Sequence, residues 1–213
     1  MPRNLNATQG IGYDIADVLD ELGMTVEIQE RVRPIIEKVD YDSNSQMTKP
    51  FNAEHFLMMM FTHHTQIVAG DLLYAVTQDV HYRVMNCFPE VFEDAIIYKQ
   101  GIVYKCNEVV SVYSPVEERD PKTLQMKTGW NAVHNKVHCL VTDKLYGSEL
   151  NTEMAFIQLD LRSRILYFPK KFDIKQKDRV VTTAYSCPYE VTNIETNTFP
   201  GMNVIYLEED TRR

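Results

Sequence analysis

Apolar and polar residues alternate along most of this chain, and the alternation predicts a protein built mainly of β-strands. Short runs rich in Val, Ile, Tyr, Phe and Thr recur from residue 56 onward, with turn residues between many of them. The runs lie at 72–76, 80–86, 95–99, 102–106, 108–113, 136–142, 154–160, 164–168, 179–184, 188–194 and 203–208. This density predicts antiparallel sheets that close into small barrels or a sandwich, and it does not fit alternating β–α–β units.

One helix is predicted close to the N-terminus. Apolar residues recur at i, i+3, i+4 and i+7 from Ile15, Asp14 can cap the first turn, and Gly23 stands where a helix ends. The alternation at 24–28 predicts a strand directly after the helix. Residues 32–39 are compatible with either a short helix or a strand, because Pro34 can start the first or interrupt the second.

The next segment predicts a long polar loop followed by an apolar run. Residues 40–52 are rich in turn formers, so we expect them to project from the body or contact a neighbour. Residues 53–60 fit a helix or a strand. The run Phe56-Leu-Met-Met-Met-Phe61 suits an irregular core, and a seam between subunits would use the same residues.

The chain contains an internal repeat. Sliding it by 107 residues aligns positions 61–98 with 168–205 without a gap. The identities are Phe61 with Phe168, Ile67 with Ile174, Asp71 with Asp178, Tyr82 with Tyr189, Val84 with Val191, Asn86 with Asn193 and Phe92 with Phe199. Tyr and Val two residues apart lie on one face of a strand, as a barrel interior requires. The repeat therefore predicts a duplicated small β-barrel.

The repeat also suggests a division of the chain. We expect residues 1–113 to hold the N-terminal helix and a first barrel, and residues 135–213 a second barrel. The stretch between them, 114–134, begins with a charged segment containing two prolines and is predicted to be a linker or an exposed loop.

Composition narrows the function. With 22 Lys and Arg against 30 Asp and Glu the formal charge is −8, which argues against a basic nucleic-acid binder. Ten Met, 12 Tyr and 9 Phe argue against disorder. The longest apolar run is far too short to span a bilayer. Cys87, Cys106, Cys139 and Cys187 form no CxxC pair, so we expect free thiols in a reducing cytoplasm.

The sequence offers few groups for catalysis. His63 and His64 are adjacent and would point to opposite faces of a strand, and their repeat counterparts are lysines. His134, His138 and Cys139 would gather on a helix and could bind zinc there, whereas on a strand the two histidines are too far apart for one ion. Phosphate-binding, nucleophile-elbow and zinc-protease motifs are absent from the sequence. We therefore expect neither an enzyme nor a cofactor or metal.

Two short motifs resemble the head-closure and head–tail connector proteins of tailed bacteriophages. In those neck proteins a turn of the form Gly-Asp-Arg/Leu-apolar precedes Tyr-x-Val. Here the first copy reads Ala69-Gly-Asp-Leu-Leu73 and later Tyr82-Arg-Val84, and the second reads Lys177-Asp-Arg-Val-Val181 and Tyr189-Glu-Val191. The second copy departs from the pattern in having Lys177 where the turn glycine is expected. The motif residues are Gly70, Asp71, Tyr82, Val84, Asp178, Tyr189 and Val191.

The resemblance implies a mainly β protein of two tandem small SH3-like or β-barrel-type units with a short N-terminal helix and long loops. It also implies a structural virion protein made in the host cytoplasm. Six or twelve copies would form a ring in the neck, joining portal or adaptor to the tail-tube or terminator proteins. Genomic DNA would pass without specific binding, and no membrane would be involved. The loop 40–52 or the stretch 114–128 would reach a neighbouring subunit.

An acidic lumen would let DNA pass without holding it. We expect acidic side chains to face the channel, among them some of Glu117, Glu118, Asp120, Glu208, Glu209 and Asp210. Three alternatives stay open: a tail terminator or baseplate ring component, a non-viral duplicated-barrel binding module, and an enzyme that uses His134, His138 and Cys139.

Overall fold

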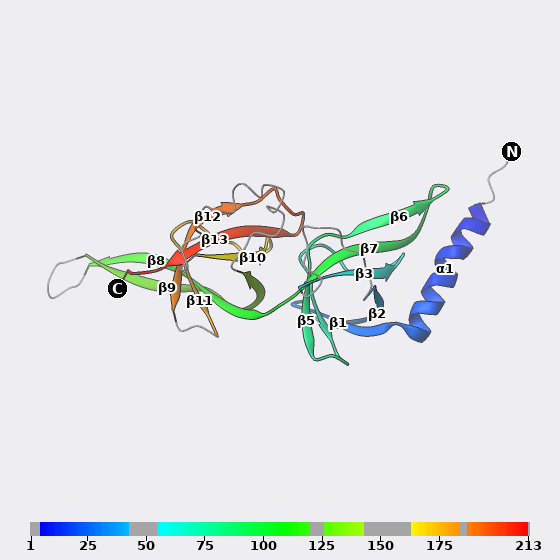
Figure 1. The fold of residues 1–213 in the computed structure, drawn as a ribbon, viewed down its shortest axis with the longest axis horizontal. Helices are drawn as coiled ribbons and strands as arrows, with labels where there is room; N and C mark the ends of the chain where they lie inside the picture. Colours follow the sequence, from blue (N-terminus) through cyan, green and yellow to red (C-terminus); the bar gives the residue numbers. More distant parts are fainter. Residues whose placement is uncertain (1–4, 43–54, 120–125, 143–162, 184–186, 213) are drawn as a thin grey trace, which may run out of the picture. The chain divides into compact units, whose positions relative to one another are not determined.

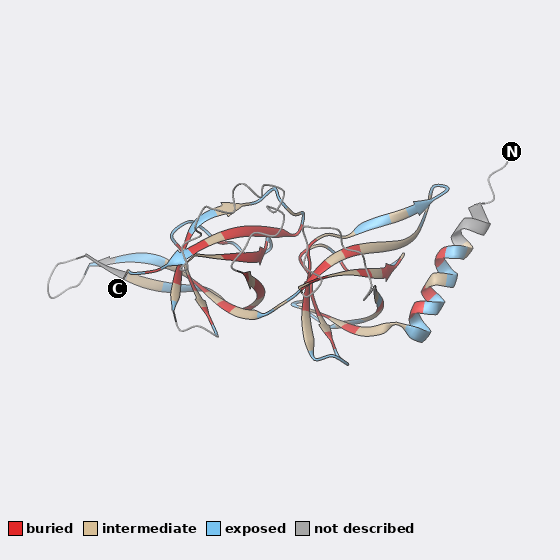
Figure 2. Cartoon of the chain, viewed as in Figure 1, coloured by how far each residue is buried: buried red, intermediate tan, exposed pale blue. Residues whose placement is uncertain are grey.

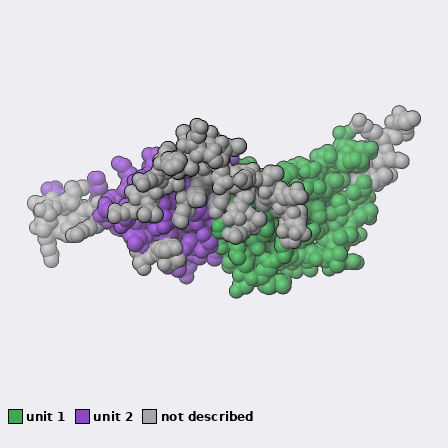
Figure 3. All heavy atoms as spheres, in the orientation of Figure 1, with its two compact units in different colours: residues 1–106, 199–201 green, residues 107–198, 202–213 purple. Residues whose placement is uncertain are grey.

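The computed structural model describes residues 5–42, 55–119, 126–142, 163–183 and 187–212, and they form a mainly β protein with one helix (Figure 1). Two closed six-strand barrels lie in tandem along the chain, which confirms the predicted fold class. The chain divides into two compact units, shown in different colours in Figure 3. Unit 1 comprises residues 1–106 and 199–201, and unit 2 comprises residues 107–198 and 202–213.

Unit 1 begins with a helix and continues as a barrel. Its elements are α1 (Leu5–Leu22), β1 (Met24–Gln29), β2 (Ile35–Asp42), β3 (Phe56–Thr62), β4 (Leu72–Ala75), β5 (Val80–Val84), β6 (Phe88–Phe92) and β7 (Ala95–Lys105). The barrel closes in the order β1-β2-β3-β7-β5-β4, because β3 pairs with β7 and β1 pairs with β4. Strand β6 pairs with β7 outside this ring. The ambiguous stretches 32–39 and 53–60 thus contribute strands.

Unit 2 is a barrel of the same connectivity. Its strands are β8 (Glu108–Arg119), β9 (Met126–Thr142), β10 (Arg164–Pro169), β11 (Arg179–Thr182), β12 (Pro188–Glu195) and β13 (Met202–Glu209). They close in the order β8-β9-β10-β13-β12-β11, so each strand has a counterpart at the same place in unit 1. Both barrels are therefore one architecture used twice.

Strand register shows how far the internal repeat extends. Leu73 pairs with Tyr82 in unit 1, and 107 residues later Val180 pairs with Tyr189 in unit 2. Val84, however, pairs with Val103, whereas Val191 pairs with Leu207, so the last strands are offset by 104 residues. The ungapped alignment at an offset of 107 residues therefore fails after Asn86. Unit 1 has three more residues than unit 2 between its fifth barrel strand and its last, where it forms the β6 hairpin.

Alternation of side chains builds each core. Buried residues are red in Figure 2, and alternate residues along a strand, such as Val26 and Ile28, belong to the core of their barrel. Val26, Ile28, Phe61, Leu73 and Val84 belong to the core of unit 1. The core of unit 2 contains the counterparts, among others Val110, Val112, Phe168, Val180 and Val191. Burial of these apolar side chains supplies most of the stability.

Helix α1 is longer than its predicted extent. It starts at Leu5, so Asp14 lies mid-helix and is not a cap, whereas Gly23 does follow the last turn. Ala16 and Leu19 are buried, and the helix lies against β7, β2 and β3. The backbone N–H of Gly23 donates to the carbonyl of Leu19, and Lys38 Nζ donates to the carbonyl of Gly23 at 3.2 Å.

The predicted division of the chain needs correction. The boundary between the units follows Cys106, so residues 107–113 belong to the second barrel. Most of the expected linker 114–134 is the paired hairpin of β8 and β9, with Pro115 opposite Trp130. Residues 40–42 of the expected loop complete β2, while 43–52 and the predicted strand at 154–160 lie outside the described residues.

Candidate functional site

The repeated aspartate motif forms the same turn in both units. The Asp71 carboxylate accepts a hydrogen bond from the backbone N–H of Val68 at 3.0 Å, and Asp178 accepts one from Lys175 N–H at 2.8 Å. The turn N–H donates to the carbonyl of the Tyr-x-Val valine, from Gly70 to Val84 in unit 1. Such aspartate-to-backbone bonds fix a turn.

The residue before each aspartate has positive φ. Gly70 has φ 93° and Lys177 has φ 71°, so the second turn keeps its tight geometry without glycine. Asp71 and Asp178 are 6% and 3% exposed, and they are held by Arg31 and Ser114 respectively. Because both carboxylates are buried and hydrogen-bonded within their own unit, these aspartates have a structural role.

The tyrosine and valine of the motif also lie in the cores. Tyr82, Val84, Tyr189 and Val191 are buried, and all four belong to the barrel interiors. The hydroxyl of Tyr82 donates to Gln78 at 2.9 Å. The motif therefore defines the barrel and presents no reactive group to solvent.

The histidines lie in separate places. His63 and His64 occupy the turn after β3, where His63 Nδ1 lies 3.2 Å from the Gly12 carbonyl oxygen and its ring packs edge-on against Tyr13. His134 Nε2 lies 2.8 Å from the Asp173 carbonyl oxygen, beside Phe172. Within the described ranges no group of three or more His, Cys, Asp or Glu side chains is arranged to hold a metal ion.

None of the four cysteines forms a disulfide, and two of them have a raised pKa, which disfavours the reactive thiolate. Burial raises the pKa of the Cys106 thiol to about 12 and also raises that of Cys87. Cys139 is fully buried in the core of unit 2. A nucleophilic thiolate requires a lowered pKa, so Cys87 and Cys106 do not have the character of nucleophiles.

The predicted channel-facing acidic residues differ in their surroundings. Glu117, Glu208 and Glu209 are exposed. The backbone of Glu118 lies opposite that of Lys127 in the register of β8 and β9, and Asp120 lies outside the described residues. Asp210 is 6% exposed and enclosed, so its assignment to a channel surface is wrong.

Asp210 is the centre of a charged cluster that holds the C-terminal segment. It accepts hydrogen bonds from Arg179 Nε at 2.7 Å and from Arg212 Nε at 2.8 Å. Both guanidinium groups lie over the ring of Trp130, at 3.6 and 5.0 Å from its centroid. Burial alone would raise the pKa of Asp210, but the bonds from Arg212 and Arg179 outweigh it and hold that pKa well below its ordinary value.

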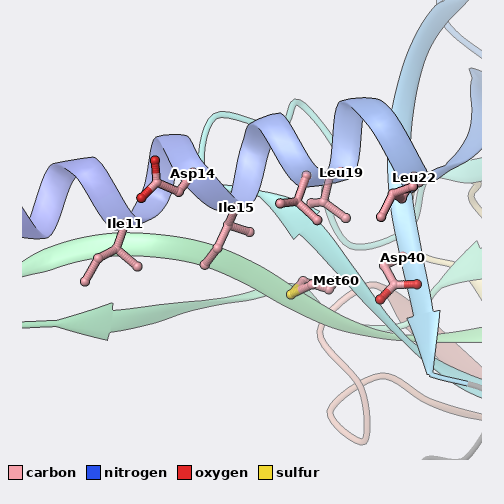
Figure 4. Close-up of a pocket in the computed structure, with 9 residues that line it drawn as sticks. Ile11, Asp14, Ile15, Leu19, Leu22, Asp40 and Met60 are labelled. Carbon is pink, nitrogen blue, oxygen red and sulfur yellow. The ribbon is translucent and has the colours of Figure 1, made fainter.

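An apolar groove in unit 1 is the surface that the sequence reasoning missed. It has a volume of about 460 Å³ and lies between α1 and the strands beneath it (Figure 4). Its lining residues are Ile11, Asp14, Ile15, Val18, Leu19, Leu22, Gly23, Asp40 and Met60. Figure 4 shows Ile11, Ile15, Leu19 and Leu22 on the side of α1 that faces Met60 and Asp40. The helical spacing of apolar residues from Ile11 to Leu22 is the sequence feature that could have predicted this apolar face of α1.

Charge is divided unequally between the units. Unit 1 has 8 Lys and Arg against 15 Asp and Glu, a formal charge of −7, while unit 2 has 14 against 15, a charge of −1. The overall charge of −8 is thus concentrated in the unit that contains the groove. Among the described residues, no helix is long and apolar enough to cross a membrane.

Comparisons of the chain with protein-family models, with curated proteins and with solved structures found no match.

Proposed function

We propose that this chain is a structural protein of a tailed-phage neck, in which copies form a ring that joins the portal or its adaptor to the tail and surrounds the passing DNA. The observation that carries the proposal is the duplicated barrel: two six-strand barrels of one connectivity, each with the aspartate turn and the Tyr-x-Val strand. The motif that resembles neck proteins thus forms a turn and part of the core in both barrels. Repeated structural units of this kind suit assembly more than chemistry.

Charge supports the same proposal. A channel that DNA must traverse should not bind the duplex, so a neutral or acidic lining is favourable. Unit 1 carries a formal charge of −7, and unit 2 adds the exposed carboxylates of Glu117, Glu208 and Glu209. Because Asp210 is enclosed by two arginines, it takes no part in this lining.

The test is the state of assembly. Native mass spectrometry and negative-stain electron microscopy of the purified chain should show rings, with six as the expected copy number. Six chains present twelve similar barrels, which could mediate between a twelve-fold portal and a six-fold tail. A ring of twelve chains would remove that rationale, and a protein that stays monomeric at high concentration would contradict the ring.

DNA binding gives a second readout. Duplex DNA in 50 mM salt should show no retardation with the purified ring, since low salt would reveal any phosphate contacts. Tight binding would overturn the proposed role of the acidic charge. Within the phage interpretation, a gene position next to portal and capsid genes favours the neck, and a position among tail genes favours a terminator or baseplate component.

One observation favours a second candidate, a binding module that acts as a monomer. The groove beside α1 is open and apolar, which is typical of a site for a peptide segment. A stable monomer that binds one partner stoichiometrically would favour this function over the neck ring.

A further inference from the structure

We propose that the groove beside α1 is a docking site for an amphipathic helix of a partner protein, with an apolar face and Lys or Arg at its margins. This inference does not depend on the neck ring, because it rests on the groove of unit 1 alone.

The shape of the groove suits a helix. Its lining runs along α1 from Ile11 to Leu22, which at 1.5 Å per residue is about 16 Å, or three helical turns. Val18 and Leu22 are 56% and 82% exposed although they line the groove. A partner helix laid alongside α1 would cover these side chains and insert its own apolar residues at i, i+3, i+4 and i+7.

The charges around the groove select a basic partner. Asp14 of α1 and Asp40 of β2 line an otherwise apolar site. Helix α1 carries four carboxylates and no Lys or Arg, and the carboxylates belong to Asp14, Asp17, Asp20 and Glu21. Glu21 lies in the last turn, where the helix dipole disfavours negative charge and where α1 has no basic residue of its own. Cationic side chains on the partner would offset this repulsion.

The same charges disfavour other occupants. A second copy that docked its own α1 here would bring four carboxylates against four, which is repulsive. Fatty acids and anionic lipid surfaces would meet Asp14 and Asp40 with like charge. A partner helix with basic margins has the complementary charge.

The experiment measures the binding of model peptides to the full chain. A fluorescein-labelled 14-residue peptide with leucines at i, i+3, i+4 and i+7 and lysines elsewhere is titrated by fluorescence anisotropy in 150 mM salt. Two matched peptides are a version with glutamate in place of lysine and a Leu/Lys version of scrambled periodicity. We expect the amphipathic lysine peptide to bind at least tenfold more tightly than either. Equal binding of the three, or no binding, would overturn the proposal.

Variants locate the binding in the groove. The double substitution Val18→Ser with Leu22→Ser should weaken the lysine peptide at least tenfold, and it should leave folding intact because both side chains are largely exposed. Val76→Ser, an exposed valine outside the groove, is the matched control and should change nothing. An unchanged affinity in the groove variant would place the peptide elsewhere and reject the site.

Neutral variants test the charge selection. Asp14→Asn with Asp40→Asn should weaken the lysine peptide several-fold and reduce the salt dependence of its affinity. Asp17→Asn with Asp20→Asn removes the same charge from exposed positions that do not line the groove, so it should have a smaller effect. Equal effects of the two pairs would mean that net charge attracts the peptide and would overturn the assignment of Asp14 and Asp40.

Self-association that the Val18/Leu22 variant abolishes, without peptide binding, would identify a second copy as the occupant and would also overturn the proposal.

Discussion

The two barrels share their strand order and their turn, yet they reverse charge at one equivalent position. Arg83 on β5 corresponds to Glu190 on β12, since each pairs with the first residue of the preceding strand, Leu72 or Arg179. Arg83 is fully buried and donates two hydrogen bonds to the Glu30 carboxylate, at 2.6 and 3.0 Å. Glu190 keeps 31% of its side chain exposed and pairs with Arg212 at 3.3 Å. The core residues on the inner face of this strand, a tyrosine and a valine, are the same in both units. The residue between them on the outer face differs, and each unit pairs it with an oppositely charged side chain of its own.

The units also differ in what surrounds the barrel. Unit 1 adds α1 with its apolar groove and the β6 hairpin, and it carries most of the negative charge. Unit 2 extends the β8–β9 hairpin and stacks Arg179 and Arg212 on Trp130. The two units therefore share a scaffold and differ in their surfaces, so the added elements are where specific function is expected.

The largest expected difference between the units comes from their ion pairs. Glu30→Gln removes the charge that compensates the buried Arg83, so it should destabilise unit 1 by about 3 kcal/mol. Glu190→Gln, at the partly exposed pair of unit 2, should cost less than about 1 kcal/mol. Hydrogen exchange of peptides from β4–β5 and β11–β12 reports on each unit separately. Equal losses in the two variants would contradict the distinction between the pairs.

The next effect depends on pH and is confined to unit 2. Because the pKa of folded Asp210 is lowered, its contribution to stability is complete above the unfolded carboxyl pKa of about 4 and is lost as pH falls through the folded value. Asp210→Asn should therefore cost about 2 kcal/mol at pH 7, and the difference from the natural protein should shrink on acidification.

Denaturation followed by fluorescence of Trp130, the chain's single tryptophan, measures this effect in unit 2. Glu208→Gln is the matched control, because Glu208 is exposed two residues away. A difference between Asp210→Asn and the natural protein that stays constant from pH 7 down to pH 3 would show that the carboxylate charge is not what stabilises the C-terminal segment.

Sequence reasoning succeeded where one face of a strand is buried. Tyr82 and Val84 point into the core and recur as Tyr189 and Val191, so periodicity and repeat agree on them. It failed for the β8–β9 hairpin, because Pro115 and the charged residues after it show no apolar alternation although the backbone is paired. Phe92 and Phe199 aligned by chance: the first lies in β6 and the second in no strand.

The groove could be predicted only in part, because it depends on residues distant in the chain. The apolar spacing in α1 was visible, but Ile11 was missed when Asp14 was interpreted as the helix cap. The opposite wall uses Asp40 and Met60, which pair across β2 and β3 and belong to segments left ambiguous or assigned to a loop. Likewise the burial of Asp210 follows from Arg179, 31 residues earlier, and local sequence does not contain that contact.

The smallest expected effects concern the aspartate turn, in which unit 1 has Gly70 at the position of positive φ and unit 2 has Lys177. Gly70→Ala should destabilise unit 1 by about 1–2 kcal/mol, since φ 93° disfavours any side chain and the new Cβ would lie 3.3 Å from the Gly201 carbonyl oxygen. Lys177→Gly should stabilise unit 2 by up to about 1 kcal/mol, because glycine adopts φ 71° without the steric cost that lysine bears. Lys177→Ala, which keeps a Cβ, is the control and should bring no gain. Hydrogen exchange at β4–β5 and β11–β12 measures both; a loss of stability with Lys177→Gly would mean that the lysine side chain, and not the backbone, maintains the second turn.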